Sequence, residues 1–366
     1  MILNAKLPLD ITLISFPFSC SAITGSGVDR YTYELYTNLV KLGFPFQLIQ
    51  KPLGSKLYRY GRVLCVTLPT LALDRAILYH ALSPYSFRLS RFFGKRRVVT
   101  TVHDVIPFAW TPENPTLFER RRKPYAELAI KKSDFLVVPF EYTKKYIIEN
   151  FDLDESKVAV VNYGIDLNRF FEAGYCNSKS NEKTKNLLFL GGVNPMNRGG
   201  ITVLKAFAVA SRSDDSLRLT ISARRSGLTR LKLEAERLNI SNRVTLVDFI
   251  SEEQLPKFIS EFDIFIYPSP MGFSYLMLQV MAVGIPVIAS NVFDNPEFID
   301  NSGLTCEQDD IDCFASSILK MVDSDATLSA LKQKSIERAK QFSPVRMAKE
   351  TLAAYSNFIE DLRTYG

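Results

Sequence analysis

Short apolar runs alternate with amphipathic segments through the first half of the chain. ITLISF at 11–16 predicts a buried strand, and GSGVDRYTYELYTNLVKLG at 25–43 predicts a helix that a glycine loop opens. Tyr31, Leu35 and Leu39 recur on one face of this helix. Further strands are predicted at 46–51, 97–105, 134–140 and 157–165. Short apolar strands separated by helices are typical of a parallel α/β sheet.

The polar stretch EAGYCNSKSNEKTKN at 172–186 interrupts this alternation, and its composition predicts a linker. A second alternating series follows, with strands predicted at 187–192, 217–223, 243–249, 264–269 and 286–290. The sequence therefore predicts an α/β protein with two doubly wound, Rossmann-like domains, at residues 1–171 and 187–343. Ligands bind beyond the carboxyl ends of the strands in such sheets, so the cleft that two such domains face is the expected site.

The composition fits this two-domain interpretation. With 366 residues, 46% hydrophobic and 23% charged, the chain is typical of a soluble globular protein of two domains. Its longest apolar runs are shorter than the roughly 18 to 20 residues that span a bilayer. The N-terminus resembles a first buried strand more than a signal peptide. We therefore expect a cytoplasmic protein, and an exported binding protein is disfavoured.

Cysteine and histidine usage limits the redox and metal chemistry. The five cysteines are Cys20, Cys65, Cys176, Cys306 and Cys313. Their odd number and the absence of a C-x-x-C pair predict free thiols in a reducing cytoplasm. The only two histidines are His80 and His103, which excludes a His-rich metal site. The D-x-D segments at 152–154 and 310–312 precede helical patterns and are interpreted as helix caps.

The net charge of +6 is concentrated in one window. Between Arg88 and Lys132 there are eleven Lys or Arg residues against four acids. Such a patch attracts nucleic acid, an anionic membrane surface or a phosphorylated substrate, unless it is only a solvated face. No zinc finger, RNA-binding signature or basic zipper accompanies it, so nucleic acid is the least favoured partner.

Two tandem doubly wound domains suit a sugar-nucleotide transferase, a nucleotide-sugar epimerase, a two-domain binding protein or a dehydrogenase. The dehydrogenase is disfavoured because Arg30 in GSGVDR occupies the third glycine position of G-x-G-x-x-G. The next strand also ends in Gln50 and Lys51, where a dehydrogenase needs an acid for the ribose.

The second half of the chain carries a more specific pattern. LFLGGVNPMNRGGITVLKAFAVAS, then ISEEQLPKFISEFDIFIYPSPMGFSYLMLQVMAVGIPVIAS, then NPEFI resembles the nucleotide-binding domain of glycosyltransferase family 4. In the first half, GSGVDRYTYEL, TVHDVIPFAW and KVAVVNYGIDLNRF resemble the glycine loop, the His-Asp segment and the segment before the linker of that family. The motifs follow the family's order and cover essentially the whole chain.

The resemblance implies the GT-B architecture and retaining transfer of a sugar from a nucleotide sugar, without a metal or other cofactor. The donor would bind to the second domain, and a glycan or lipid-phosphate-linked acceptor would bind to the first. A peripheral position at the cytoplasmic face of the membrane would bring the basic window to an anionic surface. The helix at 344–366 is expected to pack back on the first domain, as in the family.

The resemblance also assigns roles to individual residues. Arg198 in PMNRGG matches a phosphate-binding basic position, and its guanidinium can fork onto two phosphate oxygens. Gly25 and Gly27 would let the first-domain loop approach the phosphates closely. His103 matches a histidine that contacts the transferred sugar, and Asp104 would orient it or cap the next turn.

The remaining candidates lie around the last nucleotide-binding motif. Backbone N–H groups at 273–276 open a helix and would receive the diphosphate through the helix dipole. The donor-binding residues here are Gly272, Phe273, Ser274, Tyr275 and Gln279. Glu297 in NPEF resembles an acid of the nucleotide pocket, with a helix N-terminal role as the alternative.

This motif departs from the family pattern. The family has E-G-F-G, four residues, then E-A-M-A, whereas this chain has MGFSYLMLQVMA. Met271 and Gln279 replace the paired glutamates of the nucleotide pocket, and Ser274 replaces a glycine. Two hypotheses follow: an active glycosyltransferase with altered donor contacts, or a glycosyltransferase-like partner or binding subunit without catalysis.

Overall fold

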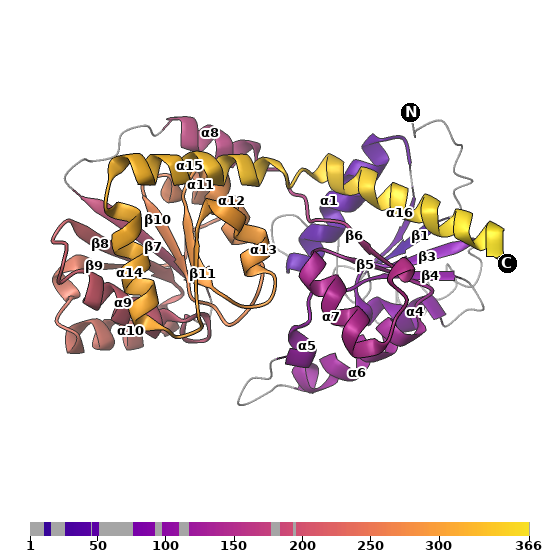
Figure 1. The fold of residues 1–366 in the computed structure, drawn as a ribbon, viewed down its shortest axis with the longest axis horizontal. Coiled ribbons are helices and arrows are strands. Elements are labelled where there is room, and N and C mark those ends of the chain that lie inside the picture. Colours follow the sequence, from indigo (N-terminus) through magenta and orange to yellow (C-terminus); the bar gives the residue numbers. More distant parts are fainter. Residues whose placement is uncertain are drawn as a thin grey trace. The chain divides into compact units, whose positions relative to one another are not determined.

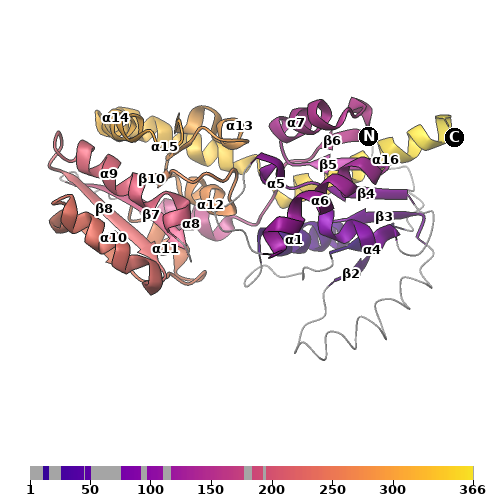
Figure 2. The same ribbon diagram turned by 90° about the horizontal axis from the view of Figure 1, so that it is seen from below.

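The chain forms two compact units. The computed structural model describes residues 11–15, 26–44, 46–50, 76–91, 97–109, 117–176, 184–192 and 195–365. Unit 1 comprises Met1–Asp166 and Phe342–Gly366, and unit 2 comprises Leu167–Gln341. Each unit contains a parallel six-stranded sheet flanked by helices (Figures 1 and 2). The two doubly wound α/β domains predicted from the sequence are confirmed.

The sheet of unit 1 has the strand order β2-β1-β3-β4-β5-β6, with all neighbouring strands parallel. Its strands are β1 Ile11–Ile14, β2 Gln47–Ile49, β3 Leu78–Ala81, β4 Arg97–Thr101, β5 Phe135–Val138 and β6 Val158–Val160. After β2 the chain crosses to the other side of β1, so the carboxyl ends of β1 and β3 form a topological switch point.

Helices cover both faces of this sheet. They are α1 Gly27–Lys41, α4 Phe87–Arg91, α5 Ile106–Ala109, α6 Leu117–Lys132, α7 Glu141–Phe151 and α16 Pro344–Tyr365. Tyr79, Val98 and Leu136 of the sheet belong to apolar clusters that α4, α6 and α7 complete. On the other face Phe135 contacts Phe358 of α16, with ring centroids 5.1 Å apart, and α1 packs along α16.

A chain of buried polar side chains crosses unit 1 beneath α1 and α16. The Nδ1 of His80, in β3, lies 2.6 Å from the hydroxyl of Tyr355, in α16, and the Nε2 lies 2.8 Å from the hydroxyl of Thr101. Thr101 in turn lies 3.1 Å from the hydroxyl of Tyr31, in α1. None of the four side chains is more than 2% exposed. Each polar atom therefore needs its partner, because an unpaired polar group is costly inside a core.

The sheet of unit 2 has the strand order β12-β11-β10-β7-β8-β9, again all parallel. Its strands are β7 Lys185–Gly192, β8 Leu217–Ala223, β9 Val244–Val247, β10 Ile264–Tyr267, β11 Val287–Ser290 and β12 Leu304–Cys306. The chain moves outward from β7 to β9 and then returns to place β10 beside β7. The switch point of unit 2 therefore lies between the carboxyl ends of β7 and β10.

Successive residues of a strand point to opposite faces of the sheet, so the core of unit 2 lies on both faces of its sheet. The helices are α8 Asn168–Cys176, α9 Gly200–Ala210, α10 Arg225–Arg237, α11 Leu255–Ile259, α12 Tyr275–Val283, α13 Asn295–Ile299, α14 Ile311–Val322 and α15 Asp325–Lys340. Leu187, Phe189 and Ile266 pack with α9, α10 and α14. The intervening Leu188 and Phe265 are fully buried as well. They point to the opposite face, where α12 packs with α8 and α15 (Figure 1).

The boundary between the units lies earlier than the linker predicted at 172–186. Residues 172–176 are the end of α8, and β7 already begins at Lys185. Residues 177–183 lie outside the described residues. Phe170 of α8 is fully buried, and the helix packs against α11 and α12. The polar composition of 172–176 therefore belongs to a packed helix that exposes some of its side chains.

Within the described residues, two strands were not predicted. β3 has only four residues and contains His80, and β12 has only three residues. Such short segments give no clear apolar run, and they are ordered by hydrogen bonds to strands that are remote in sequence.

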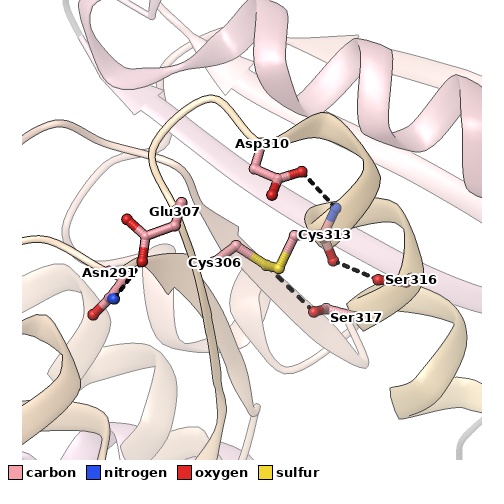
Figure 3. Close-up of a disulfide and its surroundings, with 7 residues drawn as sticks. All are labelled: Asn291, Cys306, Glu307, Asp310, Cys313, Ser316 and Ser317. Atoms are coloured by element: carbon pink, nitrogen blue, oxygen red, sulfur yellow. Dashed lines mark hydrogen bonds between the residues drawn. A yellow bond between two sulfur atoms is a disulfide. The ribbon is translucent and has the colours of Figure 1, made fainter.

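The prediction that all cysteines are free thiols is wrong for two of them. Cys306 at the end of β12 and Cys313 in the first turn of α14 form a disulfide (Figure 3). Asp310 caps α14 by accepting a 2.9 Å hydrogen bond from the N–H of Cys313, so the helix begins beside the strand end. Pairing depends on this tight turn, which the spacing of seven residues does not reveal. Cys20 and Cys65 lie outside the described residues.

Breaking this disulfide should lower the stability of unit 2 by about 2–3 kcal/mol, the loop-closure entropy of a ring of this size. Thermal unfolding of the wild type should therefore occur several degrees lower after reduction. Cys313→Ser is the matched control, and its unfolding temperature should not respond to the reductant. A wild-type unfolding temperature that is equal with and without reductant would contradict a stabilising disulfide.

His80 should make unit 1 sensitive to acid. Burial lowers the pKa of His80 to about 3, below its ordinary value of 6.5, and the nearby His103 lowers it further. As the pH falls below about 6.5, His80 binds a proton in the unfolded chain but not in the folded unit. The free energy of unfolding therefore decreases until the pH reaches the pKa of His80 in the folded unit. Between pH 7.5 and pH 5.0 the wild type should lose roughly 2 kcal/mol more than His80→Gln.

Denaturant unfolding at the two pH values measures this difference. The circular dichroism of the helices follows the unfolding of the chain in this experiment. If the wild type and His80→Gln lost stability equally, the buried neutral state of His80 would be refuted.

Candidate functional site

The switch point of unit 2 gathers most residues that the sequence assigned to the donor. After β7 the chain forms a short 3-10 helix, Met196–Arg198, and then α9. After β10 it forms the loop at 268–274 and then α12. Because β7 and β10 are adjacent and parallel, both segments emerge at the same edge of the sheet.

Arg198 is held at this edge by the last residue of β10. Its Nη1 donates a hydrogen bond of 3.2 Å to the hydroxyl of the buried Tyr267. Gly199 follows with a φ of +84°, and a Cβ here would overlap the carbonyl oxygen of Pro268. Glycine thus allows the close approach of the two segments. The guanidinium of Arg198 is fixed beside the start of the 268–274 loop.

Asp294, at the N-terminus of α13, fixes the loop before α12. Its carboxylate accepts a 2.9 Å hydrogen bond from the N–H of Phe273, and a Cβ on Gly272 would overlap the same oxygen. Ser274 caps α12 and accepts from the N–H of Leu276 at 3.2 Å. Two of the four N–H groups expected to receive the diphosphate, those of Phe273 and Leu276, are therefore already bound within the protein. Fewer backbone N–H groups than expected can therefore contact an anion at the N-terminus of α12.

Gln279, at the position of the family's second glutamate, is only 3% exposed in α12. Its Nε2 donates to Oε1 of Glu252 at 3.2 Å, and Nη2 of Arg169 donates to the same oxygen at 3.3 Å. Sequence reasoning missed Glu252 and Arg169, because the family-like segments that contain them gave neither residue a role, and only the fold brings them to Gln279. The carboxylate of Glu252 therefore lies beside Gln279, although α12 itself contains no acidic residue.

Met271 and Glu297 are the other two nucleotide-pocket candidates. Met271 is partly buried in the loop, where its N–H donates to the hydroxyl of Ser269 at 3.3 Å. Glu297 lies in the first turn of α13, and its carbonyl accepts from Arg338 at 2.7 Å. The position of Glu297 corresponds to the helix N-terminal alternative. The ring of Phe273 packs edge-on against Tyr275, at 5.3 Å between centroids.

His103 follows β4 at the carboxyl edge of the unit 1 sheet. Its Nε2 donates to the carbonyl oxygen of Leu82 at 2.8 Å, beside the switch point of this sheet. Its Nδ1 lies 3.1 Å from the hydroxyl of Tyr163, and the ring of Tyr31 packs edge-on at 4.9 Å. Both ring nitrogens therefore have partners within unit 1.

The environment of His103 keeps the imidazole neutral. Burial lowers its pKa to about 4, although the Leu82 carbonyl favours the protonated ring. At pH 7 His103 can offer hydrogen bonds to a sugar, after giving up one of its present partners. A cationic general acid at this position is disfavoured.

Of the two roles expected for Asp104, the structure shows the capping role. Its Oδ1 accepts from the N–H of Ile106 at 3.0 Å and lies 3.7 Å from Nη2 of Arg122. Gly27 is the exposed first residue of α1, directly after its cap. Gly25 lies outside the described residues.

The D-x-D segments also carry caps. Asp154 accepts a 2.9 Å hydrogen bond from the N–H of Ser156 in a 3-10 turn, and Asp310 caps α14. In the part of the chain that the structure describes, no three His, Cys, Asp or Glu side chains gather as a metal-ligand set. Donor binding without a metal or other cofactor stays a prediction.

Comparison with protein families identifies both halves of the chain. Residues 25–169 match the family described as Glycosyltransferase Family 4, and residues 184–324 match Glycosyl transferases group 1. The D-inositol 3-phosphate glycosyltransferase of Mycolicibacterium smegmatis is 27% identical over 249 residues, which are 64% of this chain and 55% of that protein. The matched region spans 30% of the length of the O-antigen chain mannosyltransferase B of Escherichia coli and 55% of the length of the Mycolicibacterium smegmatis protein.

Solved structures share the architecture of nearly the whole chain. Sucrose-phosphate synthase from Thermosynechococcus elongatus matches with a TM-score of 0.75 at 18% identity, over 96% of this chain and 99% of that one. Anabaena HepE, solved in complex with UDP, matches with a TM-score of 0.70 at 14% identity, over 95% of this chain and 100% of that one. At such identities the likeness concerns the fold alone. Together with the two family matches, it establishes that the chain belongs to the glycosyltransferases of GT-B fold, with a family 4 domain followed by a group 1 domain.

Proposed function

We propose that this glycosyltransferase moves a hexosyl group from a nucleoside-diphosphate sugar to a glycan or lipid-linked acceptor, with retention of configuration. The observation that carries the proposal is the position of Arg198 and the N-terminus of α12, both at the carboxyl end of β10. A guanidinium and a helix N-terminus at a switch point match the charge and donors of a diphosphate. UDP is the first nucleotide to test, since HepE, of the same fold, was solved with it.

The bond between the anomeric carbon and the diphosphate oxygen breaks, and its electron pair stays on the diphosphate. The acceptor hydroxyl oxygen bonds to the same carbon, and its proton passes to the leaving diphosphate. Negative charge grows on the leaving diphosphate, so fixed donors aimed at the phosphates lower the barrier. Arg198 is suited to this task because its guanidinium can fork onto two oxygens. His103 would contribute a neutral hydrogen bond to the sugar.

A second candidate function is a glycosyltransferase-like binding subunit without catalysis. It is favoured by Met271, because a thioether accepts hydrogen bonds poorly where the family has a carboxylate. The two functions differ in turnover. An enzyme releases nucleoside diphosphate from one of the UDP-, GDP- or ADP-sugars when a glycan or lipid acceptor is added. Nucleotide binding without release under any of these conditions would support the binding subunit.

Replacing Arg198 with alanine should weaken binding of UDP, or of GDP or ADP if one of these binds instead, by about 10- to 100-fold. A charge-assisted contact contributes roughly 1.5–3 kcal/mol, which corresponds to this range. Isothermal titration calorimetry measures the change, and the corresponding nucleoside without phosphates should bind the variant and the wild type equally.

Arg237→Ala is the matched control, because Arg237 is an exposed arginine of α10 that pairs with Glu234. It should bind nucleotide like the wild type. If Arg198→Ala also bound like the wild type, Arg198 would not contact the phosphates.

The basic window supports a proposed contact of unit 1 with an anionic membrane surface or lipid phosphate. Its exposed side chains within the described residues include Arg88, Arg120, Lys123, Lys131 and Lys132. No helix in the described ranges has the length and apolar character of a membrane span. The proposed attraction is electrostatic and is therefore screened by salt.

Lys131→Glu with Lys132→Glu should reduce flotation of the protein with anionic liposomes at low salt, by roughly fivefold or more for each residue lost from the surface. The control is the same change of charge in unit 2, Lys232→Glu with Arg237→Glu, which should leave flotation unchanged. Equal flotation of the wild type with neutral and anionic liposomes would rule out the contact.

A further inference from the structure

Gln279 is the one amide in the sequence YLMLQVMAV of α12, and it is nearly fully buried. A buried amide is tolerated in an apolar helix only where its polar atoms are satisfied. Its Nε2 donates to the carboxylate of Glu252. Gln279 therefore orients a charge that another segment of the chain supplies.

Glu252 is well placed to receive a ligand. It lies in the turn that follows β9, beyond the carboxyl end of that strand. Gln279 from α12 and Arg169 from α8 fix its Oε1, and Arg169 also donates to its backbone carbonyl at 3.4 Å. The Glu252 side chain is nevertheless 27% exposed. A carboxylate that is both fixed by protein donors and open to solvent is preorganised to accept hydrogen bonds.

The spacing along α12 indicates which part of a nucleotide this carboxylate would meet. Gln279 lies four residues beyond Tyr275, the first residue of the helix, which is about 6 Å along the helix axis. In the proposed function the diphosphate lies at that helix terminus. The ribose is joined directly to the diphosphate, and in doubly wound domains ribose hydroxyls are bound by a carboxylate near a strand end.

We propose that Glu252, oriented by Gln279 and Arg169, binds the ribose hydroxyls of the donor nucleotide; this inference rests on the function proposed above. Glu252 thereby takes the place of a carboxylate that α12 lacks. Gln279 is then required to be neutral, because a glutamate at this position would bring a second negative charge to the present 3.2 Å from Glu252.

A charge swap tests the proposal. UDP, GDP and ADP are titrated calorimetrically into the wild type, Glu252→Gln, Gln279→Glu and the double variant. Glu252→Gln should weaken binding about tenfold, the difference between a charged and a neutral acceptor. Gln279→Glu should also weaken binding. The double variant restores one carboxylate and one amide to the pair, and its affinity should return to within about threefold of the wild type.

The matched control is Glu253→Gln, the same change at the exposed neighbouring glutamate, and it should bind like the wild type. The 2′,3′-dideoxy analogue of the nucleotide that binds most tightly should bind Glu252→Gln and the wild type equally. Equal losses for the nucleotide and its analogue, or equal behaviour of Glu252→Gln and Glu253→Gln, would overturn the ribose contact while leaving the proposed function intact. A wild type that binds none of the three nucleotides would overturn both.

Discussion

Helices on both faces of a parallel sheet shield its central strands from water, and this constraint limits where each unit can hold polar chemistry. β5, β10 and β11 are buried at every residue. The candidates Arg198 and His103 accordingly lie in segments that follow the carboxyl ends of strands. His80 lies within a strand, and it is tolerated because the ring is neutral and both nitrogens are hydrogen-bonded.

The acidic side chains near the donor-binding candidates of unit 2 hold neighbouring segments of the protein in place. Asp294 accepts the N–H of Phe273, and Glu252 accepts the amide of Gln279 and the guanidinium of Arg169. The loop before α12 contains no charged side chain of its own. Arg198 and the helix N-terminus contribute positive potential at this edge. This arrangement suits an anionic ligand that also has a neutral portion. The neutral portion would contact the Glu252 carboxylate, whose charge is already partly compensated by the hydrogen bonds from Arg169 and Gln279.

Sequence patterns were sufficient where local periodicity decides the structure. The strand at 217–223 was predicted with its observed bounds, and the helix at 25–43 was predicted within two residues of α1 at each end. The order of the motifs also led to the GT-B glycosyltransferases. The patterns failed where the deciding contact joins remote segments. Glu252 is a candidate only because α12 lies next to it, and Cys306 pairs with Cys313 only because a cap starts α14 beside a strand end.

Unit 1 is built from two chain segments, and their order of synthesis has a kinetic consequence. The hydrogen bond between His80 and Tyr355 joins positions 275 residues apart, with all of unit 2 encoded between them. During translation, the face of β3 that α16 covers therefore stays open while residues 167–341 emerge from the ribosome. At about 5–20 residues per second, this interval lasts about 10–35 s. Unit 2 can fold within that time, whereas the core of unit 1 stays incomplete on the side of β3 that α16 covers until α16 is synthesised.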